Sequence, residues 1–233
     1  IETVDILVFD VSKTPAVYLE CASATGVTQD LADNSTVSFS AVLSPTTAST
    51  CIVVVANKEF DDIVSGFRKG VTTKVEAMEK MIHAQTGKWL ADGSTTGGYT
   101  RIPMYGEKVL SKITPSMNPI TGINMKRMLA RIDIRNNSVT SNFTVEEVYL
   151  ANYNTTGYIA PAWDTNGQVT EPIPDTPVLP AGSGKMTEEG DAILYSVNGN
   201  TPYDGEIYTF ESLAAEDAGG AGQDGEACLL YTS

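Results

Sequence analysis

RMLARIDIR (127–135) is the stretch that decides the fold class, because its side chains alternate in character with a period of two. The apolar set on one face is Met128, Ala130, Ile132 and Ile134, and the other face carries Arg127, Arg131, Asp133 and Arg135. This pattern is typical of an antiparallel strand with one face on a core and the other in water. The stretch therefore predicts a β-protein.

The same period recurs along the chain. In VDILV (4–8), Val4, Ile6 and Val8 fall on one face, with Asp5 on the other. TVSFSAVL (36–43) also alternates, whereas CIVVVA (51–56) is continuous and β-branched, which predicts a central strand covered on both faces. Further strands are expected at 16–21, 102–109, 143–151, 192–197, 206–211 and 227–232.

Helical periodicity is confined to residues 58–86. Apolar residues at 60, 63, 64 and 67 predict one short amphipathic helix, and those at 75, 78 and 82 predict a second. Strands do not alternate with helices elsewhere, so we expect no parallel βαβ fold. The sequence predicts an all-β chain, mainly strands with a short helical excursion.

Charge divides the chain into two parts. The 233 residues carry a net charge of −14. Residues 1–125 have a net charge of −3 and residues 126–233 one of −11, and Pro115, Pro119 and Gly122 mark the passage between them. We therefore predict an N-terminal domain at 1–122, with the helices near 58–86, and a C-terminal domain at 123–233. The net charge disfavours binding to nucleic acid and docking on an anionic membrane.

No catalytic, cofactor-binding or metal-binding residue is predicted. The single histidine, His83, would have to serve any zinc site, Ser-His-Asp triad or Cys-His pair. GSGKMT (182–187) fails the phosphate-loop pattern twice, and DTNGQVTE (164–171) is better explained by an Asn-Gly turn than by a calcium loop. No pair of carboxylates is singled out for hydrolysis. We therefore expect a protein that is not an enzyme and has no cofactor.

The cysteines leave two interpretations open. Cys21, Cys51 and Cys228 are far apart and have no metal-ligand spacing. They are either free or buried thiols, or Cys21 and Cys51 form a disulfide.

Several segments, in order, resemble the fimbrillin family, the Bacteroidia-type FimA/Mfa-like pilus subunits. A leading strand, VDILVFD (4–10), is followed by IVVVAN (52–57) and a helical excursion, and then by IPMYGE (102–107). RMLARIDIR looks like the strand that opens the second domain of the family, and the later family strands are matched by VEEVYLAN (145–152) and EIYTFES (206–212). The resemblance covers most of the chain.

The resemblance implies two tandem transthyretin-like β-sandwich domains and a structural or adhesive subunit of a bacterial cell-surface fimbria. It implies export as a lipoprotein precursor, contact with the outer membrane only through that precursor's lipid anchor, and other fimbrial subunits as partners. An adhesive subunit would also bind a host or bacterial surface ligand. Removal of an N-terminal strand would leave a groove, which a strand donated by a neighbouring subunit fills by β-augmentation.

The two ends of the sequence bear on that expectation. No signal or lipobox precedes Ile1, as in a mature or trimmed chain. Family members continue beyond CLLYTS (228–233) through more strands, the donor strand among them. A genuine end here would give a subunit that accepts a strand without donating one, as a tip subunit would. A chain cut short would leave the C-terminal domain incomplete.

Two sets of residues are candidates for lining the groove between subunits. The first is Val4, Ile6 and Val8, and the second, weaker one is Met128, Ala130, Ile132 and Ile134. Ordinary sandwich core is the alternative for both sets. An alternative function is a secreted glycan-binding β-sandwich module, suggested by Trp89, Trp163 and ten tyrosines.

Overall fold

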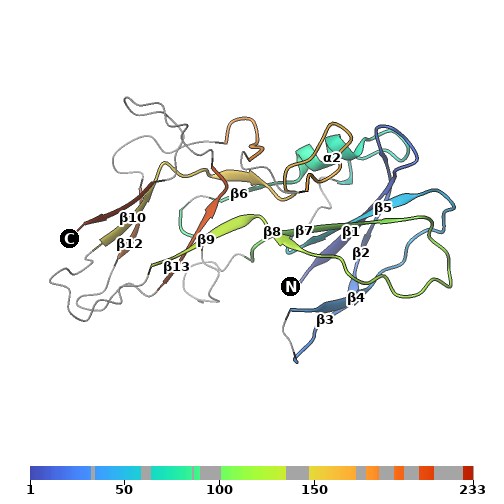
Figure 1. Cartoon of the computed structure of the whole chain (residues 1–233), viewed down its shortest axis with the longest axis horizontal. Helices are drawn as coiled ribbons and strands as arrows, with labels where there is room; N and C mark the ends of the chain where they lie inside the picture. Colours follow the sequence, from blue (N-terminus) through green and yellow to red (C-terminus); the bar gives the residue numbers. More distant parts are fainter. Residues whose placement is uncertain are drawn as a thin grey trace. The chain divides into compact units, whose positions relative to one another are not determined.

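The chain is all-β, as predicted. The computed structural model describes residues 1–32, 35–58, 64–85, 87–89, 101–134, 147–171, 177–183, 192–196, 205–212 and 228–232 (Figure 1). Within these ranges the chain forms strands β1 to β14 and a single α-helix, α2. No helix among the described residues has the length and apolar character needed to cross a bilayer.

The chain divides into two compact units, each made of several segments. Unit 1 comprises 1–83, 101–128 and 158–174, and unit 2 comprises 84–100, 129–157 and 175–233. One crossing between units, at Met128–Leu129, lies close to the boundary predicted after residue 122. The other crossings, in which 84–100 and 158–174 change sides, were not predicted.

A five-stranded antiparallel sheet forms the centre of unit 1. Its order is β2 (Val17–Ser23), β1 (Val4–Asp10), β5 (Thr50–Ala56), β7 (Met104–Leu110) and β8 (Lys126–Arg127). Every residue of β5 is buried, which confirms the central strand covered on both faces. Asp5, placed opposite the apolar face by the alternation of β1, is also buried, and its Oδ1 accepts a hydrogen bond of 2.7 Å from Ser23 Oγ.

One face of this sheet packs against α2 (Lys74–Lys80), which confirms the first part of the second predicted helix. Residue 82, which the pattern assigned to the same helix, instead begins a short strand, because the helix ends at the C-cap Met81. Thr73 caps the helix in a reciprocal capping box with Glu76, and Ala77 and Met78 are fully buried. The first predicted helix falls mostly on residues 59–63, outside the described residues.

The other face of the sheet lies under a two-stranded ribbon, β3 (Thr25–Gln29) with β4 (Val37–Ser40). Among the described residues, these two strands pair only with each other. Two short strands, β6 (Ile82–Ala84) and β11 (Thr156–Tyr158), pair with each other in a separate two-stranded sheet.

Unit 2 has a separate core between two small sheets. One sheet has the order β12 (Ile193–Ser196), β10 (Glu147–Ala151), β14 (Cys228–Thr232), and the other pairs β13 (Gly205–Phe210) with β9 (Leu129–Ile134). Val148, Leu150 and Tyr195 from the first sheet pack with Ile207 from the second. Unit 2 is therefore built as two sheets packed face to face.

Candidate functional site

The best candidate for a functional surface is the side of the unit 1 sheet that lies under the ribbon. We call the side chains of Val4, Ile6, Val8, Ile52, Val54 and Ala56 the apolar face. The antiparallel register places Val4 opposite Ala56, Ile6 opposite Val54 and Val8 opposite Ile52, so these six side chains form one continuous surface. All six are at most 4% exposed.

The layer over the apolar face is thin. The ribbon and its continuation contribute the partly buried Val27, Phe39, Ala41 and Leu43. Val42, between two inward-facing residues, is 91% exposed, and Leu31 at the ribbon's turn is 89% exposed. Two strands therefore face five, and they leave part of the apolar face to be covered by other means.

That remaining cover is the strap, residues 114–125, which contains no helix or strand. Ile120, Ile123 and Met125 touch the apolar face and stay partly exposed. At the start of the strap, Ile113 and Thr46 exchange two backbone hydrogen bonds of 2.9 Å, and Lys108 Nζ donates to the Thr121 carbonyl. In the described residues, the strap forms no ladder of backbone hydrogen bonds with the sheet.

Gly106 on β7 permits the close approach of the strap. A Cβ atom at this position would lie 2.7 Å from Met125 Sδ and 2.9 Å from the Asn124 carbonyl oxygen. Real Cβ contacts are longer than this, so any side chain at residue 106 would push the strap away. Glycine is needed here for space, since its backbone conformation is ordinary.

The first predicted groove set lies in this site. Val4, Ile6 and Val8 share one face of β1, as the alternation indicated, and are covered by the ribbon and the strap. The structure thus places them in a filled core. The layer that covers them has two strands, and the strap fills the rest. Their role as a subunit groove stays a prediction.

The second predicted set is not brought together on one strand. The strand structure is interrupted at Met128, between β8 and β9, and Met128 is buried and belongs to unit 1. Ile132 and Ile134 are partly buried beside the core of unit 2, and Ala130 is exposed. The four residues do not share one strand face because the backbone bends at Met128, between the two strands.

The opposite face of the unit 1 sheet carries a buried polar cluster. Lys74 Nζ lies 2.6 Å from Glu107 Oε2, and the Tyr105 hydroxyl donates to the same oxygen at 2.5 Å. The Lys74 side chain is 2% exposed and that of Glu107 is 22% exposed. Burial, followed by the charge of Glu107, raises the pKa of Tyr105 well above its ordinary value. The cluster ties the first turn of α2 to β7.

The cysteine question is settled for two of the three residues. Neither Cys21 nor Cys51 forms a disulfide. Burial raises the pKa of the Cys51 thiol to about 11, against the nearby Lys74 ammonium, so this thiol is a poor nucleophile at neutral pH. The side chain of Cys228 lies outside the described residues.

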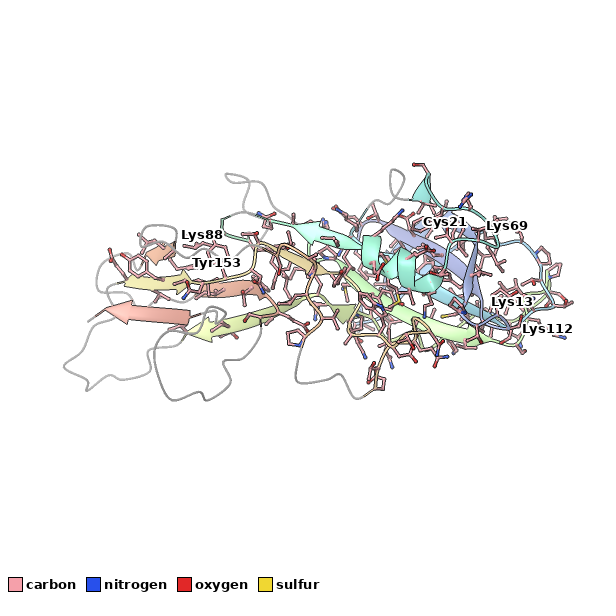
Figure 2. The ribbon with its side chains drawn as sticks, turned by 90° about the horizontal axis from the view of Figure 1, so that it is seen from above. Lys13, Cys21, Lys69, Lys88, Lys112 and Tyr153 are labelled. Carbon is pink, nitrogen blue, oxygen red and sulfur yellow. The ribbon has the colours of Figure 1, made fainter. Side chains whose placement is uncertain are left out.

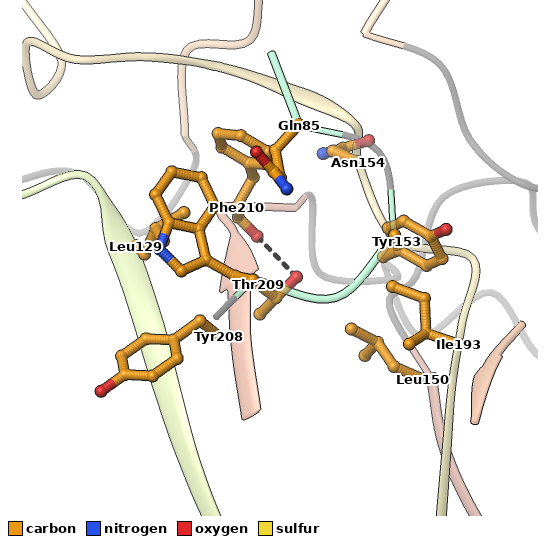
Figure 3. Close-up of a pocket in the computed structure, with 11 residues that line it drawn as sticks. Gln85, Leu129, Leu150, Tyr153, Asn154, Ile193, Tyr208, Thr209 and Phe210 are labelled. Carbon is orange, nitrogen blue, oxygen red and sulfur yellow. Dashed lines mark hydrogen bonds between the residues drawn. The ribbon is translucent and has the colours of Figure 1, made fainter. Parts of the chain in front are cut away.

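Unit 2 contains a small cavity (Figure 3). Trp89, Tyr153, Asn154, Thr209 and Phe210 are among the residues that line it. The Trp89 ring packs edge-on against Phe210 with centroids 6.0 Å apart, and Asn154 Nδ2 donates to the Glu211 carbonyl at 2.7 Å. The cavity volume is about 10 Å³, room for one water molecule and too little for a sugar ring.

The two tryptophans suggested for glycan binding differ in exposure. Trp89 is 4% exposed and cannot present its face to a sugar. Trp163 is partly exposed and packs edge-on against Tyr158 with centroids 4.9 Å apart. It borders the Asp164–Gly167 turn, where Asp164 Oδ1 accepts backbone hydrogen bonds from Asn166 and Gln168. This confirms the turn predicted for DTNGQVTE.

In the described ranges, no group of three or more His, Cys, Asp or Glu side chains is arranged to hold a metal ion. Most of GSGKMT (182–187) lies outside the described residues.

Comparison with known proteins gives likenesses among solved structures alone. No protein-family model and no curated protein matches the chain. The chain is similar to a fimbrial assembly protein from Parabacteroides distasonis, with 11% identity, a TM-score of 0.44, and coverage of 100% of this chain and 78% of that one. It is also similar to a protein named for cell adhesion from the same species, with 18% identity, a TM-score of 0.45, and coverage of 90% of this chain and 65% of that one. What the chain does has to be inferred from its own residues.

Proposed function

We propose that this chain is a structural or adhesive subunit of a bacterial cell-surface fimbria and that it works by β-augmentation rather than by catalysis. The observation that carries the proposal is the incomplete layer over the apolar face. Two ribbon strands and a strandless strap cover a face built by longer strands of a five-stranded sheet. An added strand would complete this layer.

The physics of strand addition fits this surface. The outer edge of β4 has no partner strand in the described part of the chain, and 41–43 continue its in–out alternation beyond the last paired residue. An incoming strand would gain backbone hydrogen bonds along that edge and bury alternate apolar side chains against the apolar face. Its apolar side chains would replace Ile120, Ile123 and Met125 of the strap.

The positions of the family-like segments support the proposal. VDILVFD, IVVVAN and IPMYGE are far apart in sequence, and the structure places them in three neighbouring strands, β1, β5 and β7. The segments that resemble the fimbrillin family therefore build the candidate site itself. On this proposal the protein acts at the cell surface, its partners are other fimbrial subunits, and its precursor carries the lipid anchor that the resemblance implies.

Peptide binding tests the proposal. Fluorescein-labelled peptides with the sequences of residues 3–11 and 227–233 stand in for donor strands, and scrambled peptides serve as controls. We expect saturable binding of at least one native sequence by anisotropy, together with growth in particle size by light scattering when the peptide links subunits. Inertness toward all the strand sequences would count against the proposal.

A proline at Val42 makes the test specific for the edge. Val42 is 91% exposed, so Val42→Pro removes a backbone N–H without removing a core side chain. Val42→Ala keeps that N–H and is the matched control. We expect Val42→Pro to weaken peptide binding by roughly tenfold or more and Val42→Ala to bind as the parent does. Equal loss in both would assign the effect to the side chain.

Glycan binding is the alternative function, and it now depends on Trp163 with Tyr158. Titration with a panel of glycans, read by tryptophan fluorescence, tests it. A shift that disappears in Trp163→Phe would favour a glycan site at this pair, whereas a shift that persists would come from elsewhere.

A further inference from the structure

The strap is fixed at both of its ends and is loosely held between them. At one end, Ile113 and Thr46 exchange two backbone hydrogen bonds of 2.9 Å. At the other end, β8 pairs with β7, and Lys126 lies opposite Tyr105. No residue of 114–125 is buried, although the apolar face beneath them is. The middle of the strap is therefore the part of the covering layer that opens at the lowest cost.

The strap is also longer than the span that it crosses. A strand advances about 3.4 Å per residue, so the chain from Tyr105 to Ile113 covers at most about 27 Å. The pairing of β7 with β8 adds about 5 Å, so the two ends of the strap are at most about 32 Å apart. The chain from Ile113 to Lys126 reaches about 44 Å when it is extended. A slack of about 12 Å lets the middle of the strap lift off the sheet while both ends stay paired.

Two kinds of contact hold the middle of the strap against the sheet. Three side chains pack on the apolar face, those of Ile120, Ile123 and Met125. In addition, the Lys108 ammonium group donates a hydrogen bond to the Thr121 carbonyl. Lys108 is two residues from Gly106 on β7, so both lie on the side of the strand that faces the strap. This hydrogen bond, which we call the latch, can be removed by substitution without removing an apolar contact of the strap.

We propose that the strap is an autoinhibitory segment that occupies the place of a donated strand, is held closed by the latch and lifts off between its two fixed ends. This inference rests on the proposed function, because the strap and an incoming strand would compete for the same apolar face. The apparent Kd of a strand is then its intrinsic Kd divided by the fraction of molecules in which the strap is open. The closed strap keeps the apolar face covered before assembly, as an exposed apolar surface beside an open strand edge requires.

Hydrogen exchange of the full-length chain tests the displacement directly. It is measured alone and with unlabelled peptides of residues 3–11 and 227–233, the stand-ins for donor strands. We expect a bound peptide to speed exchange in 114–125 by roughly tenfold or more and to leave the amides of β5 and β7 protected. A bound peptide that leaves exchange in the strap unchanged, or slows it, would overturn the proposal.

Lys108→Met removes the latch and keeps a long apolar side chain on β7. Lys69→Met is the matched control, because it removes the same charge from an exposed position. Lys69 adjoins Gly70, whose N–H donates to the Tyr18 carbonyl on β2, at the edge of the sheet away from β7. Figure 2 shows Lys69 on one side of unit 1 and Lys112, which precedes the strap, on the other.

We expect Lys108→Met to speed exchange in the strap and to tighten peptide binding by the same factor, roughly three- to tenfold. Lys69→Met should match the parent in both measurements. Equal changes in the two variants would assign the effect to the lost charge and would overturn the proposal.

The two measurements separate this inference from the proposed function. Peptide binding whose affinity does not follow strap exchange in Lys108→Met would overturn autoinhibition and leave β-augmentation standing. A failure of the peptides to bind the parent and Lys108→Met, with the strap opened in the latter, would reject β-augmentation itself and autoinhibition with it.

Discussion

Lys74 is the buried charge on which the packing of α2 depends. Its ammonium group is 2.6 Å from Glu107 and is almost wholly withdrawn from water. Removing one member of such a pair leaves the other buried without its counter-charge, which costs more than the pair itself contributes. We therefore expect Glu107→Gln to lower the free energy of unfolding by about 2–4 kcal/mol in urea denaturation.

The double variant Lys74→Met with Glu107→Leu is the control for that prediction. It removes both charges, so no uncompensated ion remains, and we expect it to be more stable than Glu107→Gln alone. The Tyr105 hydroxyl loses its acceptor in the double variant, so we expect the free energy of unfolding to recover only in part. A Glu107→Gln protein within 0.5 kcal/mol of the parent would contradict the structural role assigned to the pair.

His83 makes stability depend on pH. Burial, followed by the charge of Lys58, lowers the pKa of His83 to about 4 from its ordinary 6.5. The folded chain thus keeps a neutral imidazole where the unfolded chain takes up a proton. The stabilising effect is complete above pH 6.5 and is lost as the pH falls toward 4. After allowance for partial exposure, we expect a loss of about 1–2 kcal/mol over this range.

Comparison with His83→Gln isolates this effect from the carboxylates. Both proteins share the same Asp and Glu residues, so the difference between their unfolding free energies reports on the imidazole. We expect the difference to change between pH 7 and pH 4 and to be constant above pH 7. A difference that is independent of pH would show that the imidazole titrates normally in the folded chain.

At the scale of elements, the strap is the part that a single substitution can move. Gly106→Ala would place a Cβ within 3 Å of Met125 and of the Asn124 carbonyl, and backbone cannot yield as a side-chain tip does. We expect a loss of about 1–3 kcal/mol, as in other overpacked sites, and faster hydrogen exchange in 114–125. If the strap covers the acceptor site, the strand peptides should also bind this variant more tightly.

Met125→Ala is the companion variant for the strap. It removes one apolar anchor without introducing a clash, so it should loosen the strap less than Gly106→Ala does. A Gly106→Ala protein with unchanged hydrogen exchange in the strap would show that β7 shifts in place of the strap. Unchanged peptide affinity with a loosened strap would separate the strap from strand binding.

Alternation predicted β1, because its apolar residues are regularly spaced. β5 was predicted from a continuous β-branched run, which fits a strand that is buried on both faces. β3 was missed because TGVTQ has a single apolar residue facing the core, Val27. The interruption between β8 and β9 was missed because the alternation of RMLARIDIR continues through Met128 without a change. In the structure, the chain passes from unit 1 to unit 2 after this residue.

The sequence predicted one part of the candidate site, the apolar side of β1. The sequence placed Val4, Ile6 and Val8 on one face, since strand geometry alone decides that. It did not predict what covers them. Pro115, Pro119 and Gly122 indicated a boundary between domains, and the structure instead uses this segment as the strap over the apolar face. Punctuating residues show where regular structure stops, and packing against distant strands decides where the chain goes next.

At the scale of the whole molecule, the interleaved segments decide what can fold alone. Segment 158–174 belongs to unit 1, where Ile159 is 1% exposed and its N–H donates to the Met81 carbonyl at 2.8 Å. Gly167 lies against the Lys74 side chain, and Glu171 pairs with Lys126. A fragment of residues 1–128 lacks all of these contacts although it contains the entire five-stranded sheet.

We expect this fragment to melt at a lower temperature than unit 1 does in the full chain, since burial of Ile159 alone is worth about 2 kcal/mol. Joining 158–174 to residue 128 through a Gly/Ser linker in place of 129–157 should restore the melting temperature, measured by circular dichroism. The same linker followed by a scrambled 158–174 is the control, because it matches length and composition and removes only the packing. Equal melting of the two joined chains would mean that 158–174 contributes nothing specific. In that case unit 1 would end near residue 128, close to the boundary that composition indicated.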